Sequence, residues 1–165
     1  MPVKDNMGYV NILRLVFCIV LCLSAGGIGS FFTETSIDSW YSTLRKPPYN
    51  PPNWVFGPVW TILYVLMGIS FYKIWMVDLR LRANRTQLVL FLAQLILNSL
   101  WSIVFFGLEE LLLGFGVILC LWALIASTII SFNRLSNGAA ILLIPYLMWV
   151  SFAALLNYSI LVLNA

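Results

Sequence analysis

Apolar side chains in this chain of 165 residues are gathered into five long runs, which short polar segments separate. Each run is long enough to cross the roughly 30 Å hydrocarbon layer of a bilayer as an α-helix. No Asp, Glu, Lys or Arg lies deep within any run. The pattern predicts an all-α integral membrane bundle of five transmembrane helices in a single domain over residues 1–165, with spans at about 12–32, 54–76, 86–106, 111–132 and 139–163.

The composition also indicates lipid as the solvent. Hydrophobic residues make up 62% of the chain and charged residues 9%, whereas a soluble domain has about 45–50% and about 25%. The formal charge of +3 is too small and too dispersed for a nucleic-acid-binding surface. The first run also resembles a cleaved signal peptide, with Lys4 and Arg14 ahead of its apolar core, but it stays apolar beyond its small residues, which favours a span.

The connection between the first two runs, residues 33–53, is rich in proline and aromatic residues. The stretch 40–64 holds five of the seven prolines and three of the seven tryptophans. Proline pairs at 47–48 and 51–52 fix φ, remove amide donors and keep the preceding residue out of the helical region. We therefore predict a stiff, non-helical segment over residues 45–53, unlike a slack linker rich in Gly and Ser.

Ahead of the prolines, Ser36 is predicted to start a short helix that carries Trp40 and Tyr41 and ends near Leu44. Two interpretations of the whole connection stay open. It caps a binding site at the mouth of the bundle, or its prolines only terminate helices. The aromatic and basic residues favour the capping loop.

Basic residues are divided unequally between the two sides of the predicted bundle. Seven lie on the side of the N-terminus and two on the side of the capping loop. By the positive-inside rule this predicts a cytoplasmic N-terminus in a bacterial plasma membrane, with the C-terminus on the opposite side. The seven are Lys4, Arg14, Lys73, Arg80, Arg82, Arg85 and Arg134, and the two are Arg45 and Lys46.

Amide side chains lie within the predicted spans. Gln94 and Asn98 share one face of the third span, and Asn157 lies on the fifth at four-residue spacing from Trp149 and Ala153. Because an unpaired amide in hydrocarbon is costly, these groups should face the bundle interior. They either form hydrogen bonds between helices or line a ligand cavity, and the sequence leaves both open.

The residues of common catalytic and metal sites are missing. The chain has no histidine, and its three cysteines, Cys18, Cys22 and Cys120, all lie inside apolar runs. We therefore expect no metal site, no catalytic set and no obligatory cofactor. The absence of a charge at mid-membrane disfavours an ion-coupled pump.

Aromatic surface is the remaining candidate chemistry. If the capping loop folds back over the bundle, five of the seven tryptophans can converge there. A pocket with aromatic and amide walls suits a flat, largely apolar ligand. The five are Trp40, Trp54, Trp60, Trp101 and Trp149.

These motifs together resemble the translocator protein / tryptophan-rich sensory protein family, also called the peripheral-type benzodiazepine receptor family. The resemblance covers about residues 26–157. It is carried by Trp40-Tyr41, Lys46-Pro47, Pro51-Pro52, Trp54, Pro58, Trp60, Leu63-Tyr64, Gln94, Asn98, Trp101, Phe105-Phe106-Gly107, Pro145-Tyr146-Leu147, Trp149, Phe152-Ala153 and Leu156-Asn157-Tyr158.

The resemblance implies a five-helix bundle, often a homodimer, whose first loop caps a pocket for porphyrins and other flat apolar ligands. Transport, sensing and light-dependent porphyrin breakdown are the functions it implies. The ligand-binding positions that it implies, with Trp40 added from the aromatic pattern, are Gly26, Gly29, Trp40, Tyr49, Asn53, Val55, Phe56, Val59, Asn98, Leu113, Trp149, Ala153 and Leu156.

The chain departs from the family pattern at three places. Tyr49 stands where the family commonly has tryptophan, and Leu113 stands where animal members have a pocket tryptophan; both changes weaken stacking on a ligand. No basic residue follows Tyr158, so the cholesterol motif of animal members is incomplete.

Three hypotheses of function follow. The first is a receptor or carrier for a tetrapyrrole, metal-free because histidine is absent, with Arg45 and Lys46 attracting its propionates. The second is an enzyme that degrades porphyrin under light through Trp149 and Trp40. The third is a regulatory membrane protein that acts through partner proteins.

Overall fold

The computed structural model describes residues 3–77 and 82–165, which form helices and connections without any strand. Five helical segments within them are long and apolar enough to cross a membrane, so the predicted all-α bundle of five spans is confirmed. The helices are α1 (Val3–Ile37), α2 (Trp40–Thr43), the 3-10 turn η1 (Asn53–Val55), α3 (Phe56–Met76), α4 (Arg82–Ser102), the π-helical turn η2 (Ile103–Gly107), α5 (Leu111–Asn133), α6 (Asn137–Leu142) and α7 (Ile144–Asn164).

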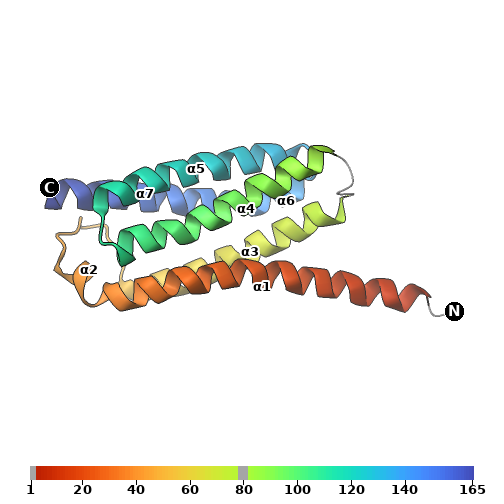
Figure 1. The fold of residues 1–165 in the computed structure, drawn as a ribbon, viewed down its shortest axis with the longest axis horizontal. Helices are drawn as coiled ribbons and strands as arrows, with labels where there is room; N and C mark the ends of the chain where they lie inside the picture. The colour runs from red at the N-terminus through yellow and green to blue at the C-terminus, as the bar shows by residue number, and fades with distance from the viewer. Residues whose placement is uncertain (1–2, 78–81) are drawn as a thin grey trace.

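The long helices run side by side, and the two termini lie at opposite ends of the bundle (Figure 1). The end that holds the C-terminus also holds α2 and the connection from η2 to α5. We call it the loop end. Helix α1 packs against α3 and α4, and α5 packs against α4 and α7. Where α3 packs on α1, a Cβ on Gly68 would lie 2.6 Å from the Ile19 Cα, so only glycine fits there.

Helix α1 is longer than predicted and takes up the start of the proposed loop. It continues through Ile37, and the short helix covers only Trp40–Thr43. The prediction that Ser36 starts the short helix was wrong. The hydroxyls of this polar stretch find hydrogen-bond acceptors while the helix continues. Thr33 donates to the carbonyl of Gly29 in the same helix at 3.1 Å, and Ser36 donates to the carbonyl of Phe106 in η2 at 2.6 Å.

The fifth span is divided into α6 and α7 with a break at Leu143. Pro145 lies in the first turn of α7, where its missing N–H leaves no helical bond unmade. The connection that we expected from Val77 to Arg85 includes Asp78 and Arg80, which lie outside the described residues. The side chains of Lys4 and Arg82, also used for the orientation, are not described either.

Candidate ligand-binding site

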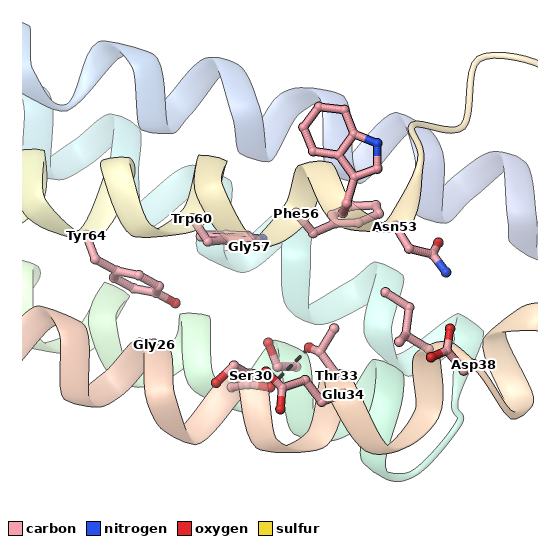
Figure 2. A pocket seen from close by; sticks show the side chains of 14 residues that line it. Gly26, Ser30, Thr33, Glu34, Asp38, Asn53, Phe56, Gly57, Trp60 and Tyr64 are labelled. Atoms are coloured by element: carbon pink, nitrogen blue, oxygen red, sulfur yellow. Dashed lines mark hydrogen bonds between the residues drawn. The ribbon is translucent and has the colours of Figure 1, made fainter.

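A cavity of about 350 Å³ lies between α1 and the start of α3, near the loop end. Its size falls in the range of about 300–1,000 Å³ that small-molecule sites occupy. Figure 2 shows the labelled side chains of α1 on one side and those of η1 and α3 on the other. The lining residues are Gly26, Gly29, Ser30, Thr33, Glu34, Ile37, Asp38, Asn53, Trp54, Phe56, Gly57, Trp60, Tyr64 and Ser102.

The α3 side of the cavity is an aromatic wall. Trp60 stacks on Tyr64, with ring centroids 5.6 Å apart and planes 27° apart, and Phe56 extends the wall toward η1. On the α1 side the Tyr64 ring occupies the space that a Cβ on Gly26 would need. The small residues predicted to allow close approach in the first span therefore admit an aromatic side chain of the bundle itself.

The rim of the cavity is acidic. Glu34 and Asp38 both line it and are both exposed. The basic residues that we expected at the rim lie elsewhere. Lys46 donates to the carbonyls of Ser42 and Leu44 at 3.3 Å each, and its Nζ lies 4.7 Å from the ring centroid of Tyr41.

A second, much smaller cavity of about 20 Å³ lies inside the bundle beneath the capping loop. Phe56 lines both cavities and so separates them. The small cavity is large enough for about one water molecule. Two of its lining residues carry polar atoms with no hydrogen-bond partner in the described part of the chain, namely the Asn157 amide and the Trp101 Nε1.

Asn98 lines neither cavity. Its side chain is 1% exposed, accepts a hydrogen bond from the Tyr64 hydroxyl and donates one to the Tyr146 hydroxyl at 2.9 Å. This network joins α3, α4 and α7. Asn98 therefore acts as an interhelical link, one of the two roles that the sequence left open, and it also holds the ring that forms the inner end of the larger cavity.

The other residues predicted for the site fall into three groups. Gly26, Gly29, Asn53 and Phe56 line the larger cavity, and Ala153 and Leu156 line the smaller one. Trp149 lies behind Phe56, with ring centroids 6.2 Å apart, and Trp40 packs edge-on against Phe105 at 5.7 Å. The residues outside both cavities are Trp40, Tyr49, Val55, Val59, Asn98, Leu113 and Trp149.

Two of these residues are on the outer surface. Tyr49 is 44% exposed and its hydroxyl shares a hydrogen bond with Ser159 on α7, which fastens the capping loop to that helix. Leu113 is 59% exposed on α5 and points away from the bundle. The structure thus does not bring these two residues together with Gly26 and Phe56.

The sequence reasoning missed the polar half of the cavity. Ser30, Thr33, Glu34, Ile37 and Asp38 follow Gly26 at the three- and four-residue spacing of one helix face. That spacing was visible, but ending the first span at residue 32 assigned most of these positions to a loop, where spacing has no such meaning.

Comparison with known proteins agrees with the motifs. The model of the TspO/MBR family matches residues 18–163. The chain belongs to the TspO/MBR family. It is 46% identical over 154 residues to the tryptophan-rich protein TspO of Chlorobaculum tepidum, with 93% of this chain and 98% of that protein covered.

Two further TspO/MBR relatives differ in name. The tryptophan-rich sensory protein of Cereibacter sphaeroides is 37% identical over 127 residues, covering 77% of this chain and 78% of that protein. The translocator protein of Homo sapiens is 36% identical over 135 residues, covering 81% and 79%. Membership and the five spans together make this chain an integral, multi-pass membrane protein.

Proposed function

We propose that this protein is a membrane receptor or carrier that binds tetrapyrroles and other flat, largely apolar ligands in the cavity between α1 and α3. The sensory and translocator names of its relatives support a role in sensing or transport. The observation that carries the proposal is the aromatic wall of Phe56, Trp60 and Tyr64 facing the glycines of α1.

The cavity favours flat ligands on physical grounds. The ring faces of α3 and the facing stretch of α1 border a cavity between the two helices, where a planar ligand can bury both faces. The described residues contain no cluster of His, Cys, Asp and Glu suited to a metal ion. We therefore expect the site to favour metal-free tetrapyrroles over those whose central metal needs a ligand from the protein.

Two glycines provide a matched test of the site. Gly57 lines the cavity and nothing lies within 4 Å of a Cβ built on it, so we expect the larger side chain of Gly57→Leu to take up part of the cavity. Gly27 has the same free space but does not line the cavity. We expect Gly57→Leu to weaken binding of protoporphyrin IX dimethyl ester at least tenfold, about 1.4 kcal/mol, and Gly27→Leu to leave it unchanged.

Binding is measured by quenching of tryptophan emission in nanodiscs of zwitterionic lipid. Both variants should keep the thermal midpoint of the parent protein, because leucine in a helix is more favourable than glycine. If Gly57→Leu and the parent protein bind the ester with equal affinity, the ligand does not bind in this cavity.

A second candidate function is light-dependent oxidation of the bound porphyrin by dioxygen. Trp149 favours it because its ring centroid lies 6.2 Å from that of Phe56, which lines the cavity. Under this alternative, illumination in air yields a product with a new absorbance spectrum, and Trp149→Phe abolishes the product while binding persists. An unchanged product yield in Trp149→Phe would contradict a role for this residue.

We also propose a homodimer in the membrane. The family resemblance supports it, and chemical crosslinking in nanodiscs loaded with one or two chains tests it. A regulatory role through partner proteins, without any small ligand, becomes the better account if no flat ligand binds to the parent protein.

A further inference from the structure

The charges around the larger cavity have one sign. Among its lining residues, two carry a formal charge, Glu34 and Asp38, and both are acidic. Glu34 lies in the last turn of α1 and Asp38 directly follows the last residue of that helix, and both side chains lie on the α1 side of the cavity, opposite Asn53 (Figure 2). The ligand therefore meets negative charge where the cavity opens to solvent.

The basic residues of the capping loop do not neutralise this rim. Lys46 is engaged by two backbone carbonyls and the Tyr41 ring, and it lines a separate groove beside α7. The backbone of Arg45 is paired with the Asn164 side chain at the C-terminal end of α7. Lys46 and the Arg45 backbone thus lie against α7, and neither residue lines the cavity between α1 and α3.

The acidic residues share the cavity with aromatic side chains. Trp54, Phe56, Trp60 and Tyr64 line it together with Glu34 and Asp38. A cationic group gains from an aromatic face within about 6 Å and from a neighbouring carboxylate, whereas a carboxylate group on the ligand is repelled by both. This combination is the chemistry of a site for organic cations.

A hydroxyl on α4 provides a second, independent observation at the cavity. Ser102 lines the cavity although its side chain is only 8% exposed, and its Oγ lies 3.0 Å from the position of a Cβ on Gly29. Within the described part of the chain this hydroxyl has no hydrogen-bond partner. A polar atom on the inner edge of a ligand can supply one, which would orient the ligand with its opposite edge at the acidic rim.

We propose that Glu34 and Asp38 make the cavity selective for flat aromatic ligands whose outer edge carries an amine or another cationic group, and that they disfavour ligands with carboxylates at that edge. This inference rests on the proposed function, because it names the ligand class of the same site. It reverses the expectation that basic residues hold the propionates of a porphyrin.

One ring with three side-chain charges tests the inference. Protoporphyrin IX has two carboxylates, its dimethyl ester is neutral, and its diamide with ethylenediamine carries two ammonium groups. Kd is measured for each by tryptophan quenching in nanodiscs of zwitterionic lipid, at low and high salt. Each exposed carboxylate should change the affinity about two- to fivefold, so we expect the diamide to bind about tenfold more tightly than protoporphyrin IX. This difference in affinity should shrink at high salt.

The decisive variant is the double substitution Glu34→Gln and Asp38→Asn, which keeps shape and removes charge. It should bring the three affinities together and leave the dimethyl ester almost unchanged. The control is Glu109→Gln with Glu110→Gln, two exposed acidic residues at the same end of the bundle that do not line the cavity. In this control the three porphyrins should keep the order of affinities that the parent protein shows.

The outcomes separate the two proposals. If none of the three porphyrins binds, the proposed function fails, and this inference falls with it. If all three bind with equal affinity, or if the double variant keeps the order of the parent protein, the charge selectivity is refuted and the proposed function stands. Thermal midpoints of unfolding establish that the double variant at Glu34 and Asp38 and the control variant are both folded.

Discussion

The hydrogen-bonded network around Asn98 allows a sharp test of how the bundle is held together. The Asn98 amide bonds the hydroxyls of Tyr64 on α3 and Tyr146 on α7, and its side chain and that of Tyr146 are almost completely buried. In Asn98→Leu both hydroxyls lose this partner, and that of Tyr146 is left fully buried. Since the Tyr64 ring forms the inner end of the cavity, the same change also frees that ring.

The cost follows from two known ranges. An interhelical hydrogen bond in a membrane contributes about 0.6 kcal/mol on average and about 1.7 kcal/mol at most, and a stranded buried polar group costs about 1–3 kcal/mol. Two bonds are lost here, so we expect Asn98→Leu to lower the free energy of unfolding by about 1–3 kcal/mol. Removing all three polar groups together should cost less, because nothing is then left unpaired.

The assay is reversible unfolding by SDS in mixed micelles, followed by tryptophan emission. The control is Ser127→Ala, which removes an exposed hydroxyl bonded only to the Ala123 carbonyl of its own helix and should change the free energy by less than about 0.5 kcal/mol. The reasoning is refuted if Asn98→Leu is as stable as the parent protein. It is also refuted if the triple variant, with Tyr64→Phe and Tyr146→Phe added, is less stable than Asn98→Leu alone.

Three further predictions concern the packing and the loop. Gly68→Ala would force a Cβ to within 2.6 Å of the Ile19 backbone and should cost about 1–3 kcal/mol in the same assay, whereas Gly27→Ala, with open space around it, should not destabilise. Equal effects of these two changes would contradict the close helix contact. Burial raises the pKa of Tyr41 in the capping loop from 10.0 to about 12, partly offset by its hydrogen bond to Asn50. Because the folded pKa lies above the unfolded one, this contribution to stability is complete below about pH 10 and is lost as the pH rises toward about 12; Tyr41→Phe should flatten that part of a pH titration of the thermal midpoint, and an unchanged profile would contradict it. Cys120 is the exposed thiol, so a lipid-soluble maleimide should modify it in the folded protein and reach the two buried cysteines of α1 only after unfolding, as mass spectrometry would show.

The membrane class and the number of spans could be predicted from the sequence because they depend on local properties. A run of about 20 apolar residues has no other stable state than a helix in lipid, whatever its neighbours are. The faces of the third and fifth spans were predictable for the same reason. Gln94, Asn98 and Trp101 recur at helical spacing, and all of them are buried.

The end of the first helix was harder to predict, because polarity alone does not end a helix. The hydroxyls of Thr33 and Thr35 bond back to carbonyls of their own helix, and Ser36 bonds to η2. This last contact joins residues 70 positions apart. No pattern within the stretch itself contains that information.

The sequence by itself determined that this protein is a five-span membrane bundle with a stiff, tryptophan-bearing connection, and its motifs determined the family. Only the tertiary structure decided where the open space lies and what charge surrounds it. The cavity inside the bundle beneath the capping loop holds only about 20 Å³, and the cavity of about 350 Å³ with the aromatic wall opens instead between α1 and α3. A cavity is the volume that packed side chains leave unfilled, so it depends on the relative placement of several helices. For that reason the acidic pair Glu34 and Asp38 became part of the site only when the whole bundle was assembled.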